Sequence, residues 1–366
     1  MATGVSYLGI LFVNPIALRY PHFQRHITVL GWSMCILGLI GASFATQVWH
    51  LILFQGVFYG VGWVVCYTPF LILLNQWFDK KRGLAYGILF GASGISGLFL
   101  PFLLEALLHR FGFRTTLRAF AVATALCSGP GLLMIKPRIP PAMISRKPGR
   151  NNHAFLRNPL VYVFAASILL QGLAFFLPNI FLPSYALALN LPPSSGDLLL
   201  AITSLAQVTC QIALGHFSDK ASIHLPSHAC ALISGLAVLL LWGPARDFGR
   251  LAAFAALWGA TAGSYSVLWT RVAAVLAPGP EETQTLYGWF SFERGVANVL
   301  CGPIAAVLLG EEVDAARYGL GRYAGVVGFT GGCLLVSSLG VVVWWWDRGE
   351  KSGRERVGRL DAGIPL

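Results

Sequence analysis

Glu293 and Arg294 are two adjacent charged residues inside an otherwise apolar stretch that reads SFERGVAN. If this stretch spans a membrane, each charge near the helix centre costs about 2.5–3.5 kcal/mol on insertion scales. A cost of that size calls for a partner, a wet cavity or a function. Neighbouring residues point about 100° apart on a helix, so Glu293 shares a face with Trp289, and Arg294 shares one with Phe290 and Asn298.

This arrangement suggests a site for an anion. We expect Arg294, together with Asn298, to meet an anionic substrate group in a central cavity, and Glu293 to carry or couple a proton. The alternative is structural. Arg294 would then snorkel to the nearer membrane face, about 11 Å along the helix, and Glu293 would pair with a basic residue on another helix.

Other polar or amphipathic side chains within apolar stretches are further candidates for contact with the same substrate. Each of them also has an ordinary interpretation, as a hydrogen-bonding partner of a neighbouring helix or as a packing or interface residue. The candidates are Gln171, Asn179, Gln207, Gln211 and Trp289.

Two charged segments lie in the predicted connections between spans. The first is the run Asp79, Lys80, Lys81 and Arg82, which by itself is typical of a loop that orients a membrane protein. The second holds Gly215, followed four residues later by Asp219 and then Lys220. At a helix end, an aspartate accepts hydrogen bonds from backbone donors while a lysine meets a phosphate or a carboxylate. Such a clasp can hold two helices together and release them.

The sequence contains no pattern typical of catalysis, of metal binding or of cofactor binding. The seven cysteines stand singly in apolar stretches, and the eight histidines form no H-E-x-x-H pattern. A nucleophile motif and a phosphate-binding loop after a strand are also missing. We therefore expect no enzyme, no catalytic residues, no metal and no bound cofactor, with a proton gradient as the energy source.

The composition places these residues in a bilayer. The chain has 366 residues, of which 56% are hydrophobic and only 11% are charged, far below the quarter found in soluble proteins. The net charge of +11 is then typical of cytoplasmic loops, so we expect no nucleic acid partner. Apolar runs predict eleven membrane spans near 2–18, 27–47, 50–75, 84–105, 115–135, 159–183, 197–217, 226–243, 251–275, 286–309 and 323–346.

The spans fall into two groups separated by a basic, proline-containing stretch. We expect an N-terminal helical half at 1–135, a cytoplasmic linker at 136–158, a C-terminal helical half at 159–346 and a cytoplasmic tail at 347–366. With the linker inside, 18 of the 26 Lys and Arg residues face the cytoplasm, as the positive-inside rule requires. Met1 then lies outside.

An internal repeat relates the two halves. A shift of 201 residues aligns Tyr86-Gly87 with Tyr287-Gly288, Gly94 with Gly295, and Gly62 with Gly263. Two duplicated halves are typical of secondary transporters. In this register the span at 2–18 corresponds to that at 197–217, the second span of its half, so the first half has no counterpart of the span at 159–183. Glycines at helical spacing favour close helix packing.

Motif residues give the chain a family resemblance. The stretch GHFSDK at 215–220 resembles the cytoplasmic loop motif of the major facilitator superfamily. The stretch NQWFDKKRGLAYGI at 75–88 is similar to the signature of its monocarboxylate porters, in the fungal-type branch. The resemblance implies an all-α polytopic fold of two pseudo-repeated halves with twelve helices, the first of which has no counterpart here. It also implies a gating role for the charged loop segments.

The chain departs from that pattern in two further places. The first copy of the loop motif has Asn14 and Leu18 where Gly and Asp would stand. The seventh span has Gln207 and Gln211 in a region where many members of that family carry an arginine, so the resemblance implies no arginine clamp for an anion at that place.

The expected function is secondary transport. We predict a multi-pass membrane protein that moves a small organic anion, monocarboxylate-like, or a related metabolite by alternating access, driven by proton symport. The alternative is a transport-incompetent relative that acts as a ligand sensor or interaction protein. The partners are a small-molecule substrate and the lipid bilayer, and the sequence sets no oligomeric state. The plasma membrane is the default location, with a vacuolar or other internal membrane also open.

Overall fold

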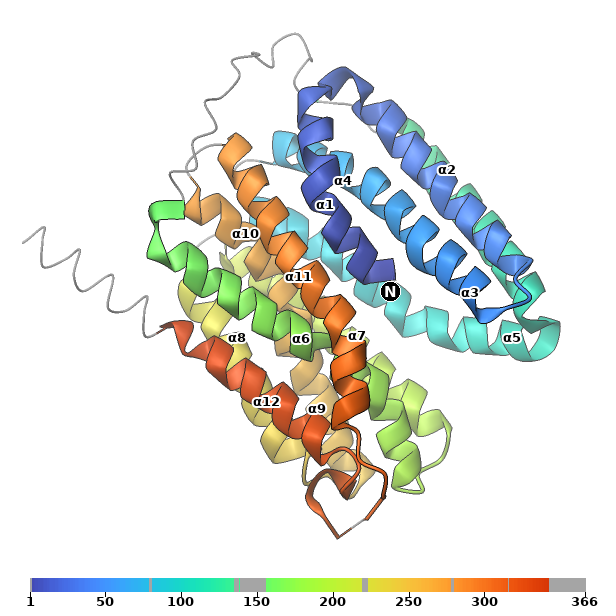
Figure 1. Ribbon diagram of the computed structural model, residues 1–366, viewed down its shortest axis with the longest axis vertical. Helices are drawn as coiled ribbons and strands as arrows, with labels where there is room; N and C mark the ends of the chain where they lie inside the picture. The colour runs from blue at the N-terminus through green and yellow to red at the C-terminus, as the bar shows by residue number, and fades with distance from the viewer. Residues whose placement is uncertain are drawn as a thin grey trace, which may run out of the picture.

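The fold is a bundle of long helices joined by short connections (Figure 1). The computed structural model describes residues 2–78, 81–134, 138, 156–218, 223–277, 280–314 and 316–341. Most of the predicted linker at 136–158 and all of the predicted tail at 347–366 lie outside these residues. We call the end of the bundle where α5 ends and α6 begins the linker end, and the opposite end the far end.

The first half comprises the elements before the linker. They are α1 (Ala2–Arg19), the short 3₁₀ turn η1 (Pro21–Phe23), α2 (Gln24–Ser43), α3 (Val48–Leu51), the π-helical η2 (Ile52–Phe58), α4 (Tyr59–Trp77) and α5 (Arg82–Met134). α3, η2 and α4 follow one another without a break and form one crossing of the bundle.

The second half comprises the elements after the linker. They are α6 (Pro159–Ala188), α7 (Ser194–Ser218), α8 (His224–Ala237), the π-helical η5 (Val238–Trp242), α9 (Phe248–Trp258), the π-helical η6 (Gly259–Gly263), α10 (Tyr265–Leu276), α11 (Pro280–Leu308), the 3₁₀ turn η7 (Tyr318–Leu320) and α12 (Ala324–Ser338).

These helices agree with the predicted spans. Eight helical segments of the described residues are long and apolar enough to cross a bilayer. One of them, Gly83–Leu132, contains two spans, because Gly112 has a φ of +72° that interrupts α5. α11 carries charged residues and α12 has only 15 residues, so neither is among these eight segments. Both nevertheless run through the bundle (Figure 1). The fold is therefore the predicted all-α polytopic one, with about eleven crossings in the described part of the chain.

The halves meet along two helix pairs. Within the first half α2 and α1 pack on α4, and within the second half α6 packs on α11 and α12. Between the halves, α5 packs on α7 and α1 packs on α11. The 201-residue shift carries α1 onto α7 and the first part of α5 onto α11, so the two contacts between halves are equivalent under the repeat.

The repeated glycines lie in these two contacts. A side chain added at Gly94 would be 2.6 Å from Val208 Cγ2 on α7, and one added at Gly295 would be 2.7 Å from the backbone nitrogen of Leu8 on α1. Glycine thus allows close approach of the helices at both crossings. The repeat seen in the sequence marks the surfaces on which the two halves touch.

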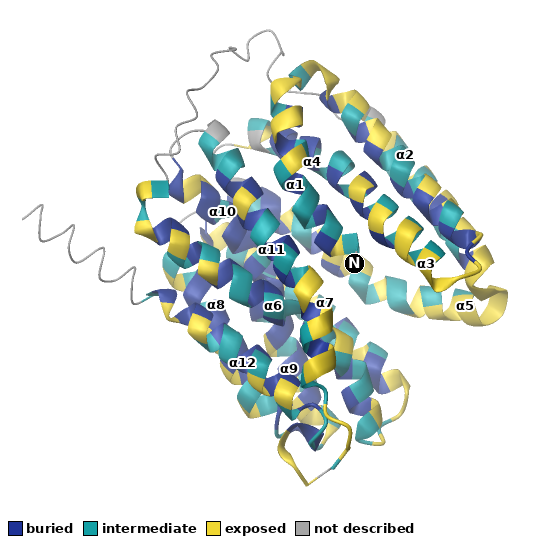
Figure 2. Cartoon of the chain, viewed as in Figure 1, coloured by how far each residue is buried: buried dark blue, intermediate teal, exposed yellow. Residues whose placement is uncertain are grey.

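One face of α5 is left uncovered in the described structure. On α11, Arg294 and Ala297 are 3% and 0% exposed beneath α6, whereas their repeat equivalents on α5, Ser93 and Ser96, are exposed. Figure 2 shows α5 with mostly exposed and intermediate residues. Among the described residues the first half thus has no counterpart of α6, as the repeat register predicts.

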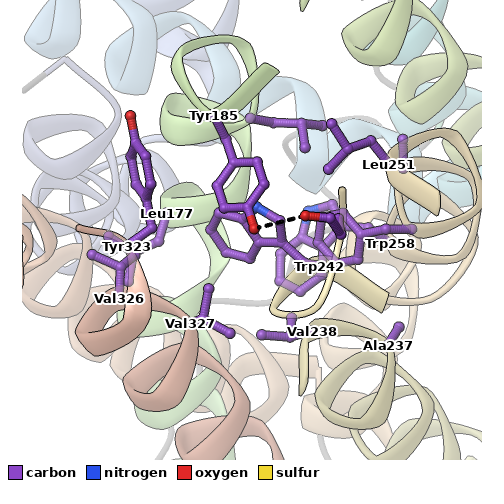
Figure 3. Packing of buried hydrophobic residues seen from close by; sticks show 14 of the residues in the cluster. Leu177, Tyr185, Ala237, Val238, Trp242, Leu251, Trp258, Tyr323, Val326 and Val327 are labelled. Atoms are coloured by element: carbon purple, nitrogen blue, oxygen red, sulfur yellow. Dashed lines mark hydrogen bonds between the residues drawn. The ribbon is translucent and has the colours of Figure 1, made fainter. Parts of the chain in front are cut away.

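The second half has the denser apolar core, near the far end. Trp242 stacks on Phe254 with ring centroids 5.4 Å apart, and Trp258 and Val327 are fully buried in the same cluster (Figure 3). The Tyr185 hydroxyl donates to backbone carbonyls in the turn after η5. This core fixes α6 and thereby the residues that α6 presents to α11.

Candidate functional site

Arg294 lies midway along α11, which begins at Pro280 and ends at Leu308. Hydropathy predicts that this span begins near residue 286, but the helix starts six residues earlier. At 1.5 Å per residue, the Arg294 backbone is about 21 Å from the linker end of its helix rather than about 11 Å. The charge is therefore at the centre of the bundle.

The guanidinium of Arg294 is enclosed by one amide and two aromatic rings. Its Nη1 donates to Oε1 of Gln171 at 3.2 Å, and the side chain is 3% exposed. Its central carbon lies 5.0 Å from the ring centroid of Phe175 and 5.8 Å from that of Trp269. We call Arg294, Gln171, Phe175 and Trp269 the Arg294 site. The guanidinium is held in the interior, so the snorkelling alternative does not describe this structure.

The Arg294 site contains no anion of its own. Among the described residues the ion pairs are Glu105–His109, Asp247–Arg250 and Asp314–Arg317, all with exposed side chains. Cation–π contacts contribute about 0.5–2 kcal/mol each, much less than the cost of removing a cation from water. A bound anion would offset the remainder of that cost.

Neighbouring amides also have unused hydrogen-bonding capacity. Nε2 of Gln171 is buried without a hydrogen-bond partner among the described residues, and so are both side-chain polar atoms of Asn298. Asn298 is one turn beyond Arg294 on α11, on the same face. Buried polar atoms are nearly always bonded, so these groups are available to water or to a ligand.

The local sequence of α6 explains how the site is assembled. Gln171 and Phe175 are four residues apart and share a helix face, which is the face turned toward α11. Gly172 lies between them, and a side chain added there would be 2.8 Å from Cβ of Ala297 and 3.5 Å from Cγ of Arg294. Only a residue without a side chain lets α11 approach this closely.

Trp269 connects the site to the first half. Its ring stacks on Tyr287 with centroids 5.1 Å apart and an interplanar angle of 2°, and Tyr7 of α1 lies 6.3 Å from it. Trp269 also belongs to a buried cluster that includes Ile10 and Val64 of the first half. The Arg294 site is therefore at the boundary between the two halves, where ligands of duplicated transporters bind.

A family model extends across almost the whole chain. Two matches to the model described as Major Facilitator Superfamily cover residues 1–196 and 164–362. The chain belongs to the major facilitator superfamily. It is thus a multi-pass integral membrane protein, and the resemblance derived from the loop motifs is confirmed.

Curated relatives come from the same superfamily. The chain is 25% identical over 285 residues to the MFS transporter asaE of Aspergillus flavus, covering 78% of this chain and 64% of that protein. It is 28% identical over 256 residues to human monocarboxylate transporter 11, covering 67% of this chain and 54% of that protein. The chain therefore spans less than two thirds of the length of either relative. These relatives are transporters rather than enzymes.

A solved structure of the superfamily has the same fold. The crystal structure of the human organic anion transporter MFSD10 (TETRAN) matches with a TM-score of 0.66 over 93% of this chain and 82% of that chain. The sequences are 15% identical, so this likeness concerns the fold alone.

Glu293 and Trp289, two further candidate residues on α11, are not part of the Arg294 site. Glu293 is half-buried, with Oε2 enclosed and without a hydrogen-bond partner among the described residues. No described basic side chain forms an ion pair with it. Trp289 is 46% exposed and therefore does not enclose Arg294.

The remaining predicted amides do not contact Arg294 in the bonds found among the described residues, although Oε1 of Gln211 is buried without a partner there. Gln211 is buried and donates through Nε2 to the carbonyl of Gly263 at 3.1 Å and to Oγ of Ser266 at 3.0 Å. Gln207 lies against the same π-helical turn, η6. Asn179 donates to the carbonyl of Phe175 in its own helix at 3.5 Å. The structure brings Gln171 and Arg294 together and places these three amides in other contacts.

The predicted gating residues are described only in part. Gly215 is buried, with its α-carbon turned toward the carbonyl of Gly83 on α5, and Lys81 is exposed. Asp79, Lys80, Asp219 and Lys220 lie outside the described residues, as does the side chain of Arg82.

Sequence reasoning missed Phe175 and Trp269. Phe175 carries a detectable signal, because it follows Gln171 by one helical turn in a polar–aromatic pair. Trp269 carries none, because only the packing of α10 against α11 brings it to Arg294.

Proposed function

We propose that the chain is a secondary active transporter that moves a small organic anion, monocarboxylate-like, by alternating access. The observation that carries the proposal is the buried Arg294, which has an amide and two aromatic rings around it but no carboxylate partner among the described residues. A single cation favours a single negative charge on the substrate, since the filled site is then neutral.

The position of the site supports the same proposal. Arg294 is central in α11, and its neighbour Trp269 packs with residues of both halves. Alternating access requires a binding site at such a boundary, because the halves must rock around it. Human monocarboxylate transporter 11, to which the chain is 28% identical, is named for an anionic class of substrate, in agreement with this proposal.

Uptake into proteoliposomes tests the proposal. The purified chain is reconstituted, and uptake of radiolabelled lactate, pyruvate and benzoate is measured with acid outside, alongside radiolabelled tetraethylammonium as a cationic control. We expect saturable uptake of at least one carboxylate, none of the cation, and loss of uptake when the pH gradient is collapsed. Uptake of the cation alone would contradict the proposal. Saturable carboxylate binding without uptake would support the ligand-sensing alternative.

Proton coupling is assigned to Glu293, whose carboxylate has one enclosed oxygen without a partner among the described residues. A carboxyl group with no fixed cation is free to gain and lose a proton as its surroundings change. The Glu293→Gln variant is expected to lose stimulation by the pH gradient and to retain carboxylate exchange across the membrane at equal pH. Both rates are measured in the same vesicles.

Glu105 provides the matched control for this variant. It is an exposed glutamate at the far end of the first part of α5, 4.0 Å from His109. Glu105→Gln is expected to keep the full response to the gradient. An unchanged response in Glu293→Gln would remove Glu293 from the coupling step.

A further inference from the structure

The two contacts between the halves differ at the linker end. Under the 201-residue shift, Asn14 of α1 corresponds to Gly215 of α7, and Gln284 of α11 corresponds to Gly83 of α5. Asn14 faces Gln284 and Gly215 faces Gly83, so the two pairs form equivalent crossings. Their chemistry can be compared residue by residue.

The α5–α7 crossing is closed by direct backbone contact. A side chain added at Gly215 would lie 2.5 Å from the carbonyl oxygen of Gly83 and 3.2 Å from the α-carbon of Gly87. Two glycines on α5 and one on α7 therefore let the helices touch without any side chain between them.

The α1–α11 crossing is closed by a side chain. Asn14 is 3% exposed, and its Nδ2 donates to the carbonyl oxygen of Gln284 at 2.8 Å. A side chain added at Gly288, the equivalent of Gly87, would lie 3.7 Å from Nδ2 of Asn14, in ordinary contact. At the α1–α11 crossing the Asn14 side chain thus fills a space that, beside Gly215 at the α5–α7 crossing, is taken by the backbone of α5.

The hydrogen bond makes this crossing sensitive to separation. If α1 moves away from α11 at the linker end, Nδ2 of Asn14 loses its acceptor, and Oδ1 already has no partner among the described residues. An unpaired amide in an apolar surrounding is unfavourable. The bond therefore favours the conformation in which the linker end is closed.

We propose that Asn14 is a latch that holds the linker ends of the two halves together through the Gln284 carbonyl. The latch deepens the proposed transport function, because alternating access requires the linker end to open. It is neutral, so its strength does not depend on pH, unlike the proton-coupling step. Interhelical hydrogen bonds in membrane proteins contribute about 0.6 kcal/mol on average and about 1.7 kcal/mol at most, which corresponds to about threefold to twentyfold in an opening equilibrium.

Cysteine labelling at position 17 tests the latch. Ala17 is fully buried and lies three residues beyond Asn14 on α1, on the same face. The full chain carrying Ala17→Cys is placed in nanodiscs and treated with a maleimide, and the labelled peptide is quantified by mass spectrometry, so that the native cysteines do not interfere. Adding Asn14→Leu, which keeps the volume but removes the amide, is expected to raise the labelling rate at least about threefold. Asn14→Ala serves as a second variant if the leucine impairs folding.

The matched control is Asn179→Leu in the same background. Asn179 is an asparagine inside α6 whose one side-chain hydrogen bond among the described residues goes to a carbonyl of its own helix. We expect it to leave the labelling rate at position 17 unchanged. Labelling of both Asn14 variants at the rate of the parent would overturn the latch, as would an equal increase with Asn179→Leu. No substrate is present, so the result stands whether or not the chain transports a carboxylate.

Discussion

Replacing Arg294 with alanine is expected to reduce carboxylate uptake by at least about 100-fold while leaving the amount of folded protein in the membrane within about twofold. Loss of a buried charged partner for an anion costs about 2–5 kcal/mol, and 3 kcal/mol corresponds to roughly 150-fold in affinity. Folding should survive, because no described carboxylate is left unpaired by the change. The measurement is initial-rate uptake of the carboxylate that the wild type transports, normalised to protein by fluorescence-detected gel filtration.

Arg118→Ala is the matched control for this prediction. Arg118 also combines one side-chain hydrogen bond, to Oγ of Ser43 at 3.1 Å, with a ring contact, 4.7 Å from the centroid of Phe44, but it is exposed near the far end. Its removal should leave uptake nearly unchanged. If Arg294→Ala keeps wild-type uptake, or if it fails to fold while Arg118→Ala is normal, Arg294 is a structural residue rather than an anion-binding one.

A larger side chain at position 172 is expected to reduce uptake by more than about tenfold and to lower thermal stability, although it changes no charge. The space beside Gly172 is occupied by Ala297 and Arg294, so valine forces α6 away from α11. Overpacking of this kind costs about 1–3 kcal/mol. The separation also breaks the hydrogen bond from Arg294 to Gln171, which is 3.2 Å long. Thermal unfolding in detergent and uptake in vesicles are measured on the same Gly172→Val preparation.

Gly302→Val separates local crowding from the general effect of valine in a membrane helix. Gly302 is on α11, and a side chain added there meets nothing within 4 Å. This variant should match the wild type in both measurements. Equal losses in Gly172→Val and Gly302→Val would show that the close approach of α6 to α11 has no special part in the site.

The helices could be predicted from the sequence because hydropathy is a local property. Long apolar runs predict membrane spans whatever the tertiary structure, and the described helices agree with them. The predicted start of α11 was less accurate. Glu282 and Thr283 lie in a polar stretch that predicts a loop, but the helix begins at Pro280. Membrane helices commonly extend into the polar interface, so a change in polarity does not mark the helix end. That error placed Arg294 too close to the linker end.

The site could be predicted only in part. An isolated charge pair in an apolar stretch is unusual enough to single out Arg294, and Gln171 is recognisable as a polar residue in a span. Their hydrogen bond joins residues 123 positions apart, which no local pattern encodes. The sequence also could not distinguish Gln171 from Gln211, because both are glutamines in spans and only their neighbours differ.

The repeat proved more informative than its few identities suggested. Its glycines mark the surfaces where the halves touch, because close backbone approach tolerates no side chain. In the sequence, Asn14 is a departure from the glycine of the loop motif. In the structure, this residue makes a hydrogen bond between the halves. A departure from a repeat can therefore indicate a new interaction.

Equilibrium binding to purified protein tests most directly whether Arg294 holds the substrate anion. Binding of the radiolabelled carboxylates is compared among the wild type, Arg294→Gln and Arg118→Gln, each confirmed as monodisperse. We predict saturable carboxylate binding by the wild type and by Arg118→Gln, and a loss of at least about 100-fold in affinity for Arg294→Gln. Binding by Arg294→Gln with the affinity of the wild type would contradict the assignment of Arg294 as the anion-binding residue.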